Sequence, residues 1–91
     1  MADVLSDEEI DDRAPEGWHH EGDEIVRTYE FDEYLDGVEF ASEAAEIADE
    51  EFHHPEITIR YDEVAIALTS HEEGGVTDQD IQMAEHFDDA R

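Results

Sequence analysis

Histidine is the residue type in this sequence best suited to carrying out chemistry. The chain has six histidines, grouped as His19-His20, His53-His54, His71 and His86. An unperturbed imidazole has a pKa of about 6.5, so it can donate or accept a proton near neutral pH. The same ring is a common metal ligand. Acid–base catalysis and metal binding are therefore the two kinds of chemistry that these residues could perform.

The hairpin pattern after the second histidine pair predicts that His54 and His71 converge. If Asp62-Glu63 forms a two-residue turn, Tyr61 pairs with Val64, and the same register places His54 directly opposite His71. Directly opposed residues on adjacent strands have Cβ atoms about 4.5–5.5 Å apart. Two imidazoles distant in the chain would then share one site.

The same register also predicts the core contacts of this hairpin. Ile57 would face Leu68, and Ile59 would face Ile66. Successive side chains of a strand point to opposite faces of the sheet. Because His54 has the opposite parity from Ile57, we expect it on the open face of the sheet, away from the helices.

Two alternatives to an acid–base site remain open for these histidines. His53 would lie next to the pair, and Pro55 would hold His54 in extended backbone. A metal site could combine the three histidines with Asp49, although the close helical spacing of an H-E-x-x-H motif is missing. The plainest alternative is a charged sheet edge with incidental histidines.

The other histidines and the glycine pair are weaker candidates for a functional site. His19 and His20 are neighbours on an expected strand, so at most one of them can join a given site. We expect His86 on the surface of a helix. Gly74-Gly75 precedes a helix start that could bind an anion, but acidic residues flank it and favour a simple turn.

Charge and composition exclude several classes of function. The 91 residues include 30 Asp and Glu but only 4 Lys and Arg, which gives a net charge of −26, and there is no cysteine. A chain with so few cations will not bind nucleic acid through its phosphates, and anionic membranes are disfavoured for the same reason. Disulfides and thiolate nucleophiles are impossible. Disorder and mimicry of nucleic acid are the other interpretations of such acidity.

High salt reconciles this charge with a folded protein. At ~1 M salt the Debye length is ~3 Å, so repulsion among carboxylates is largely screened. Acidic residues in place of lysine are typical of salt-accumulating haloarchaea. We therefore expect an ordinary enzyme with a halophilic surface.

The chain shows no targeting or membrane signal. The segment Met1–Asp7 lacks the basic and apolar regions of a signal peptide. The longest apolar run, Val64–Leu68, is far too short to span a bilayer. A soluble cytoplasmic protein is the expectation.

Apolar periodicity predicts seven elements in one domain spanning residues 1–91. Ser6 and Glu9 match a capping box that opens a short helix ending before Pro15. Alternation predicts strands at 18–20, 25–31, 57–61 and 64–68. Thr77 is the expected N-cap of a last helix, whose apolar side comprises Ile81, Met83, Ala84 and Phe87.

A longer helix is predicted between the two strand pairs. Its apolar stripe recurs at spacings of three and four residues and comprises Tyr34, Val38, Ala41, Ala45, Ala48 and Phe52, widened by Phe40, Ala44 and Ile47. The order helix, two strands, helix, two strands, helix favours an α+β fold. We expect a four-stranded antiparallel sheet with three helices packed on one face.

Acidic, histidine and aromatic residues follow one another at defined spacings in the second half of the chain. Asp49 is followed after three residues by His53-His54-Pro55, after five more by Tyr61, after nine more by His71, and after eight more by Asp80. This spacing resembles that of the pterin-4a-carbinolamine dehydratases. The resemblance spans roughly residues 17–87, and its flanking matches are Gly17-Trp18, the strand end at Tyr29–Phe31, Phe40 and Gly74-Gly75-Val76-Thr77.

The resemblance implies the same fold and a dehydratase, or hydro-lyase, activity. The reaction eliminates water from 4a-hydroxytetrahydropterin (4a-hydroxytetrahydrobiopterin) to give quinonoid dihydropterin. By this resemblance His53 and His71 are the acid–base pair and His54 positions the pterin. The other implied substrate-binding residues are Asp49, Asp80, Pro55 and Trp18. The resemblance implies no metal ion, no organic cofactor, and a homodimer or homotetramer.

Three positions depart from the family's usual residues. Asp49 stands where many members have Glu, Phe52 where many have Asn or Asp, and Ile57 where Trp is frequent. These departures bear on substrate fit and rate rather than on the type of reaction. The alternative function is a non-catalytic protein-interaction module on the same scaffold.

Overall fold

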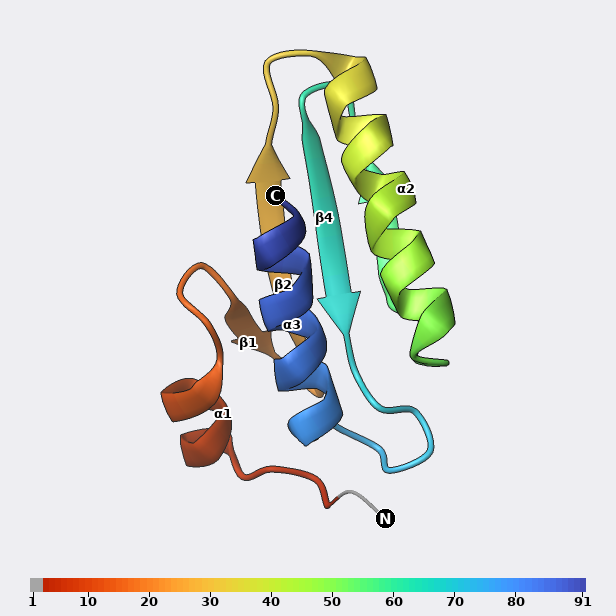
Figure 1. Cartoon of the computed structure of the whole chain (residues 1–91). Coiled ribbons are helices and arrows are strands. Elements are labelled where there is room, and N and C mark those ends of the chain that lie inside the picture. The colour runs from red at the N-terminus through yellow and green to blue at the C-terminus, as the bar shows by residue number, and fades with distance from the viewer. Residues whose placement is uncertain (1–2) are drawn as a thin grey trace.

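The chain folds into one antiparallel sheet with its larger helices on one face. A computed structural model describes residues 3–91; Met1 and Ala2, the start of the segment considered for a signal peptide, lie outside that range. In chain order the elements are α1 (Asp7–Arg13), β1 (His19–Glu21), β2 (Glu24–Glu30), α2 (Tyr34–Glu50), β3 (Glu56–Ile59), β4 (Glu63–Leu68) and α3 (Asp78–Ala90). Figure 1 shows α2 and α3 in front of the sheet and α1 beside β1.

The strand order is β1-β2-β4-β3, and every neighbouring pair is antiparallel. The predicted α+β architecture is therefore confirmed. Within residues 3–91, no helix is long and apolar enough to cross a membrane.

The core lies between the sheet and the two larger helices. Val64, Ile66 and Leu68 alternate along β4 and are completely buried, as is Ile25 opposite Leu68 on β2. The predicted apolar side of α3 is confirmed, since Ile81, Met83, Ala84 and Phe87 are all buried.

The buried face of α2 differs from the predicted stripe. The helix buries Gly37, Phe40, Ala41, Ala44 and Ala48. The prediction was wrong for three members of the stripe, because Tyr34, Ala45 and Phe52 are exposed. Tyr34 is the first helical residue and Phe52 lies beyond the last one, so neither continues the face that meets the sheet.

The β3–β4 register also differs from the prediction. The backbone N–H of Arg60 donates to the carbonyl of Glu63 at 2.8 Å, so the two turn residues are Tyr61 and Asp62 instead of the predicted Asp62 and Glu63. Ile57 therefore pairs with Ile66, and Ile59 with Val64. The predicted pairs Tyr61–Val64, Ile57–Leu68, Ile59–Ile66 and His54–His71 are wrong. A shift of two residues keeps each side chain on its predicted face, because strands have a period of two.

The short helix α1 begins as the sequence predicts. Ser6 Oγ accepts the N–H of Glu9, and the Glu9 carboxylate accepts the N–H of Ser6. These hydrogen bonds lower the pKa of Glu9 below its usual value. They satisfy backbone donors that a helix N-terminus otherwise leaves without partners.

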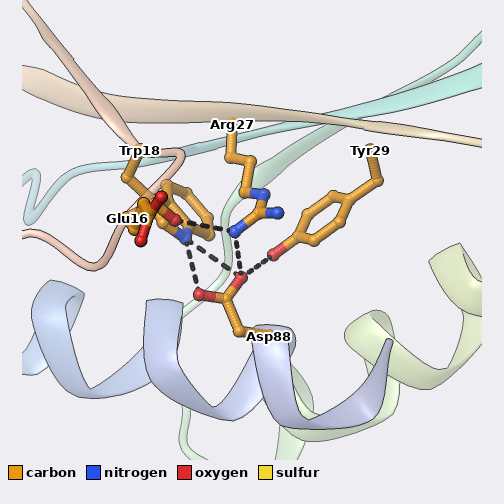
Figure 2. A network of polar contacts seen from close by, with 5 residues as sticks. All are labelled: Glu16, Trp18, Arg27, Tyr29 and Asp88. Atoms are coloured by element: carbon orange, nitrogen blue, oxygen red, sulfur yellow. Dashed lines mark hydrogen bonds and ion pairs between the residues drawn. The ribbon is translucent and has the colours of Figure 1, made fainter.

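A polar network ties the second half of α3 to the sheet (Figure 2). Three side chains converge on the Asp88 carboxylate: Trp18 Nε1 donates at 3.2 Å, Arg27 at 3.2 Å, and the Tyr29 hydroxyl at 2.5 Å. Arg27 also donates to the backbone carbonyl of Glu16. Burial, with a smaller contribution from the bond to Asp88, raises the pKa of Tyr29 well above its ordinary range. The phenol therefore stays protonated as a donor.

Candidate functional site

Three of the histidines singled out above line one cleft. Its volume is about 320 Å³. It opens where α2 ends, where β4 ends and where α3 begins. The lining residues are Phe52, His53, His54, Thr69, Ser70, His71, Glu72, Glu73 and Gln79. The structure thus brings His53, His54 and His71 to one place, although not through the predicted strand register.

The end of α2 sets the position of the histidine pair. The helix stops at Glu50, and Phe52 adopts a left-handed backbone with φ of +53°. The N–H of His53 then donates to the carbonyl of Ala48 at 3.1 Å, closing the last turn. Such an ending redirects the chain sharply. In a bulky residue a left-handed backbone costs on the order of 1–3 kcal/mol.

His53 is held by a buried carboxylate. Its Nε2 is within hydrogen-bonding distance of Oδ1 of Asp80, whose side chain is fully buried. The other carboxylate oxygen accepts the Ser70 hydroxyl at 2.8 Å and the backbone N–H of Thr77 at 2.9 Å. Ser70 and Thr77 hydroxyls also share a hydrogen bond of 2.8 Å. Asp80 is therefore paired and hydrogen-bonded, as a buried charge must be.

This arrangement decides which nitrogen of His53 can act on a ligand. An ionised carboxylate only accepts hydrogen bonds, so Nε2 of His53 carries a proton toward Asp80. Nδ1 is then the nitrogen left for proton exchange. A carboxylate behind a histidine fixes its tautomer and compensates the charge it gains on protonation. Among the site histidines, His53 is therefore the one whose Nε2 is held by a buried carboxylate.

His71 reaches the same cleft from a tight loop. An isolated bridge joins Ser70 to Gly75, and the N–H of Gly74 donates to the carbonyl of Ser70 at 2.8 Å. Gly74 has φ of +85°, a conformation that glycine adopts without strain. The loop holds His71 at the surface of the cleft. The prediction of a turn at Gly74-Gly75 is confirmed.

His54 and Asp49 form the outer, solvent-exposed part of the site. His54 Nε2 lies 3.2 Å from an Asp49 carboxylate oxygen, and their side chains are 60% and 84% exposed. A pair this exposed is worth little in stability. The contact joins the His54 ring to the last turn of α2.

Four of the predicted site residues lie outside the cleft lining: Asp49 and Asp80, which contact lining histidines, and Pro55 and Trp18. Pro55 follows the histidine pair and is half-buried. Trp18 is buried and bonded to Asp88. Asp88 follows Asp80 by eight residues along α3, which separates the two by about 12 Å along the helix axis. The structure therefore does not bring Trp18 to the histidines.

The described residues do not converge as a metal site. Among residues 3–91, no group of three or more His, Asp or Glu side chains is placed to hold a metal ion. The three histidines share a cleft, but they are not gathered around one point. The alternative of three histidines with Asp49 as metal ligands therefore has no geometric support in this part of the chain.

Several site residues were missed by the sequence interpretation. Ser70 and Thr77 complete the surroundings of Asp80, and Phe52 lies at the cleft beside His53. Thr77 was identified only as a helix cap. The available signal was its spacing of three residues before Asp80, which places the Asp80 side chain against the backbone of the cap. Nothing in the sequence identified Ser70.

Comparison with known proteins gives one consistent family. The sequence profile of the family described as pterin 4 alpha carbinolamine dehydratase matches residues 3–90. A Halobacterium salinarum protein named for these dehydratases is 63% identical over 91 residues, covering all of both chains. A Natronomonas pharaonis protein of the same name is 54% identical over 98% of this chain and 97% of its own.

A solved structure agrees with the fold. The protein from Brucella melitensis described as a transcriptional coactivator/pterin dehydratase is 32% identical, with a TM-score of 0.89. The alignment covers 97% of this chain and 98% of that one. With the fold, the histidine cleft and the sequence relatives in agreement, this chain belongs to the pterin 4 alpha carbinolamine dehydratase family.

Proposed function

We propose that this protein is a dehydratase acting on a 4a-hydroxytetrahydropterin. The observation that carries the proposal is the cleft in which His53, backed by buried Asp80, lies with His71. One imidazole has a fixed tautomer and a compensating carboxylate. The other stands on an exposed loop. Elimination of water needs these two components, a base and an acid.

The proposed elimination needs one proton donor and one proton acceptor and no further reactant. His71 donates a proton to the 4a-hydroxyl, the C4a–O bond breaks, and water leaves. His53 takes the proton of a ring nitrogen at its Nδ1, and the electron pair left on nitrogen forms the C=N bond of the quinonoid product. Asp80 compensates the charge that His53 gains. Positioned acid–base residues of this kind contribute roughly 10²–10⁴ in rate.

The remaining polar groups of the cleft suit a pterin. The amino group and ring N–H of a pterin are donors, and a carboxylate accepts two parallel hydrogen bonds well. Glu72 and Glu73 provide carboxylates in the cleft lining, and Gln79 provides an amide. In this proposal His54, oriented by Asp49, positions the ring.

The deciding experiment is a dehydration assay in molar KCl. Decay of the 4a-hydroxypterin absorbance should be faster with the protein than without it. His71→Gln should remove most of the acceleration, whereas His86→Gln, an exposed histidine on α3, is the matched control and should keep it. An uncatalysed rate with folded wild-type protein would refute the proposal.

A second candidate is a non-catalytic interaction module. It is favoured by the Brucella melitensis relative, whose description includes transcriptional coactivator, and by the exposure of Leu35 on α2, at 72%. The same assay separates the two, because an interaction module would give no acceleration. A partner protein would then be sought on the α2 surface.

We also propose that the protein forms homodimers or homotetramers. Large apolar side chains remain exposed on the described chain: Val4, Tyr34, Leu35, Phe52, Ile59 and Tyr61. A domain of this size, when alone, buries a smaller fraction of the surface of its unfolded chain than a larger domain does. Light scattering in ~3 M KCl, where carboxylate repulsion is screened, should give a mass of two or four chains.

A further inference from the structure

Phe52 is placed in an unusual way for an apolar residue. It follows Ala48 by four residues, so continuation of α2 would carry it along the face that buries Ala48. Instead the chain leaves the helix through the left-handed backbone of Phe52, and the side chain is 87% exposed. Glycine and asparagine fit this conformation without the same steric conflict. Phenylalanine therefore adds nothing to the helix end or to the core.

The place where Phe52 emerges is the rim of the histidine cleft. It directly precedes His53, and it is the one large apolar side chain among the residues that line the cleft. The other lining residues carry imidazole, hydroxyl, carboxylate or amide groups. Those groups can bond to the edge of a flat heterocycle, but none of them offers the broad apolar face that such a ring also needs.

We propose that Phe52 is a stacking platform that binds the planar ring of the pterin and raises the selectivity of the cleft for flat bicyclic substrates. This inference rests on the proposed function. An aromatic side chain that stacks on the face of a heterocyclic base strengthens binding substantially, and this contact needs no hydrogen bond. The carboxylates of Glu72 and Glu73, which also line the cleft, would then accept hydrogen bonds from the edge of the ring while Phe52 covers its face.

The test uses substitutions whose effects on stability and binding have opposite signs. Phe52→Asn and Phe52→Gly remove the ring and suit the left-handed backbone. Both variants should melt at or above the wild-type temperature in ~3 M KCl. Their affinity for 7,8-dihydrobiopterin, measured by calorimetry, should fall about tenfold, the factor that corresponds to about 1.4 kcal/mol. In turnover, KM should rise while kcat changes far less.

Two further variants control for ring and surface effects. Phe52→Tyr keeps the aromatic face and should retain wild-type affinity. Tyr61→Asn removes an aromatic side chain that is 78% exposed, in the β3–β4 turn away from the cleft, and should change neither affinity nor KM.

Each result bears on either the inference or the function. Wild-type affinity in both Phe52→Asn and Phe52→Gly overturns the stacking role and leaves the dehydratase proposal standing. Loss of affinity only in step with loss of oligomer mass assigns Phe52 to a subunit contact and also overturns it. Binding of dihydrobiopterin without turnover refutes the dehydratase alone, and the Phe52 variants still decide the inference. No binding by folded wild-type protein refutes both.

Discussion

His53 and Asp80 are 27 residues apart in the chain, yet the imidazole Nε2 meets the buried carboxylate directly. The same carboxylate accepts the backbone N–H of Thr77 at the start of α3. One side chain thus completes a helix cap and orients a histidine. The position of that histidine is therefore fixed by the packing of α3 on the sheet and not only by its neighbours in sequence.

Replacing Asp80 with asparagine should separate charge from shape. In Asp80→Asn the amide keeps the size of the side chain but loses the negative charge and one acceptor oxygen. We expect dehydration to slow by roughly 10²-fold or more, because His53 loses its tautomer control. The free energy of unfolding should fall by about 1–3 kcal/mol. A variant with wild-type turnover in the absorbance assay would contradict the proposed role of Asp80.

The two histidines proposed as acid and base should differ in their effect on stability. His71 is exposed on its loop, so His71→Ala should lower the rate roughly 10²–10⁴-fold with little change in unfolding free energy. His53 compensates a fully buried carboxylate, so His53→Ala should lose both activity and on the order of 3 kcal/mol of stability. Urea titrations at constant KCl measure the difference. Equal stability of the two variants would show that Asp80 does not depend on His53.

Alkaline pH should weaken the network around Asp88. Burial raises the pKa of Tyr29 in the folded protein, whereas an unfolded tyrosine ionises near pH 10. Between these values the unfolded chain releases a proton that the folded chain keeps, so stability is full below about pH 10 and falls above it, by up to about 1.4 kcal/mol per pH unit.

The matched variant for this effect is Tyr29→Phe. It should be less stable at neutral pH, because Asp88 loses the donor that lies at 2.5 Å. It should also lack the part of the alkaline decline that Tyr29 contributes. Parallel pH profiles for variant and wild type in urea titrations would argue against the phenol as the titrating group.

Salt should control folding and assembly. All four arginines already have partners, in the ion pairs Arg13–Asp78, Arg27–Asp88 and Arg60–Glu63 and in the bond from Arg91 to the Glu30 carbonyl. The remaining carboxylates repel one another over a Debye length of about 10 Å at ~0.1 M salt and below ~3 Å at ~3 M. We expect reversible loss of oligomer or fold at low KCl. Identical circular dichroism melts at both concentrations would remove the halophilic interpretation.

Local patterns in the sequence predicted most of the fold. Alternation marked Val64, Ile66 and Leu68 as core, and the Ser6–Glu9 spacing marked the start of α1, because both signals depend on neighbouring residues only. The β3–β4 register was missed because it depends on which two residues form the turn, and the segment Arg60–Glu63 has no glycine, asparagine or proline to mark them.

The site was predicted less completely than the fold, for a similar reason. Spacing identified His53, His54 and His71, which the structure places in one cleft. The partners of Asp80 could not be foreseen, since Ser70 reaches it only after α3 has docked. Phe52 was assigned to the core because its helical period continues past the point where the helix ends.

Helix α3 is fastened to the rest of the molecule near both of its ends. Asp80 joins its first turn to Ser70 and His53, and Asp88 joins its last turns to the sheet through Arg27 and Tyr29. A segment held in this way cannot open locally without breaking the core beneath it. In native-state hydrogen exchange, the α3 amides should therefore exchange only through global unfolding, in one cooperative unit with β4. The contact between Asp80 and His53 would then be lost only when the whole domain unfolds.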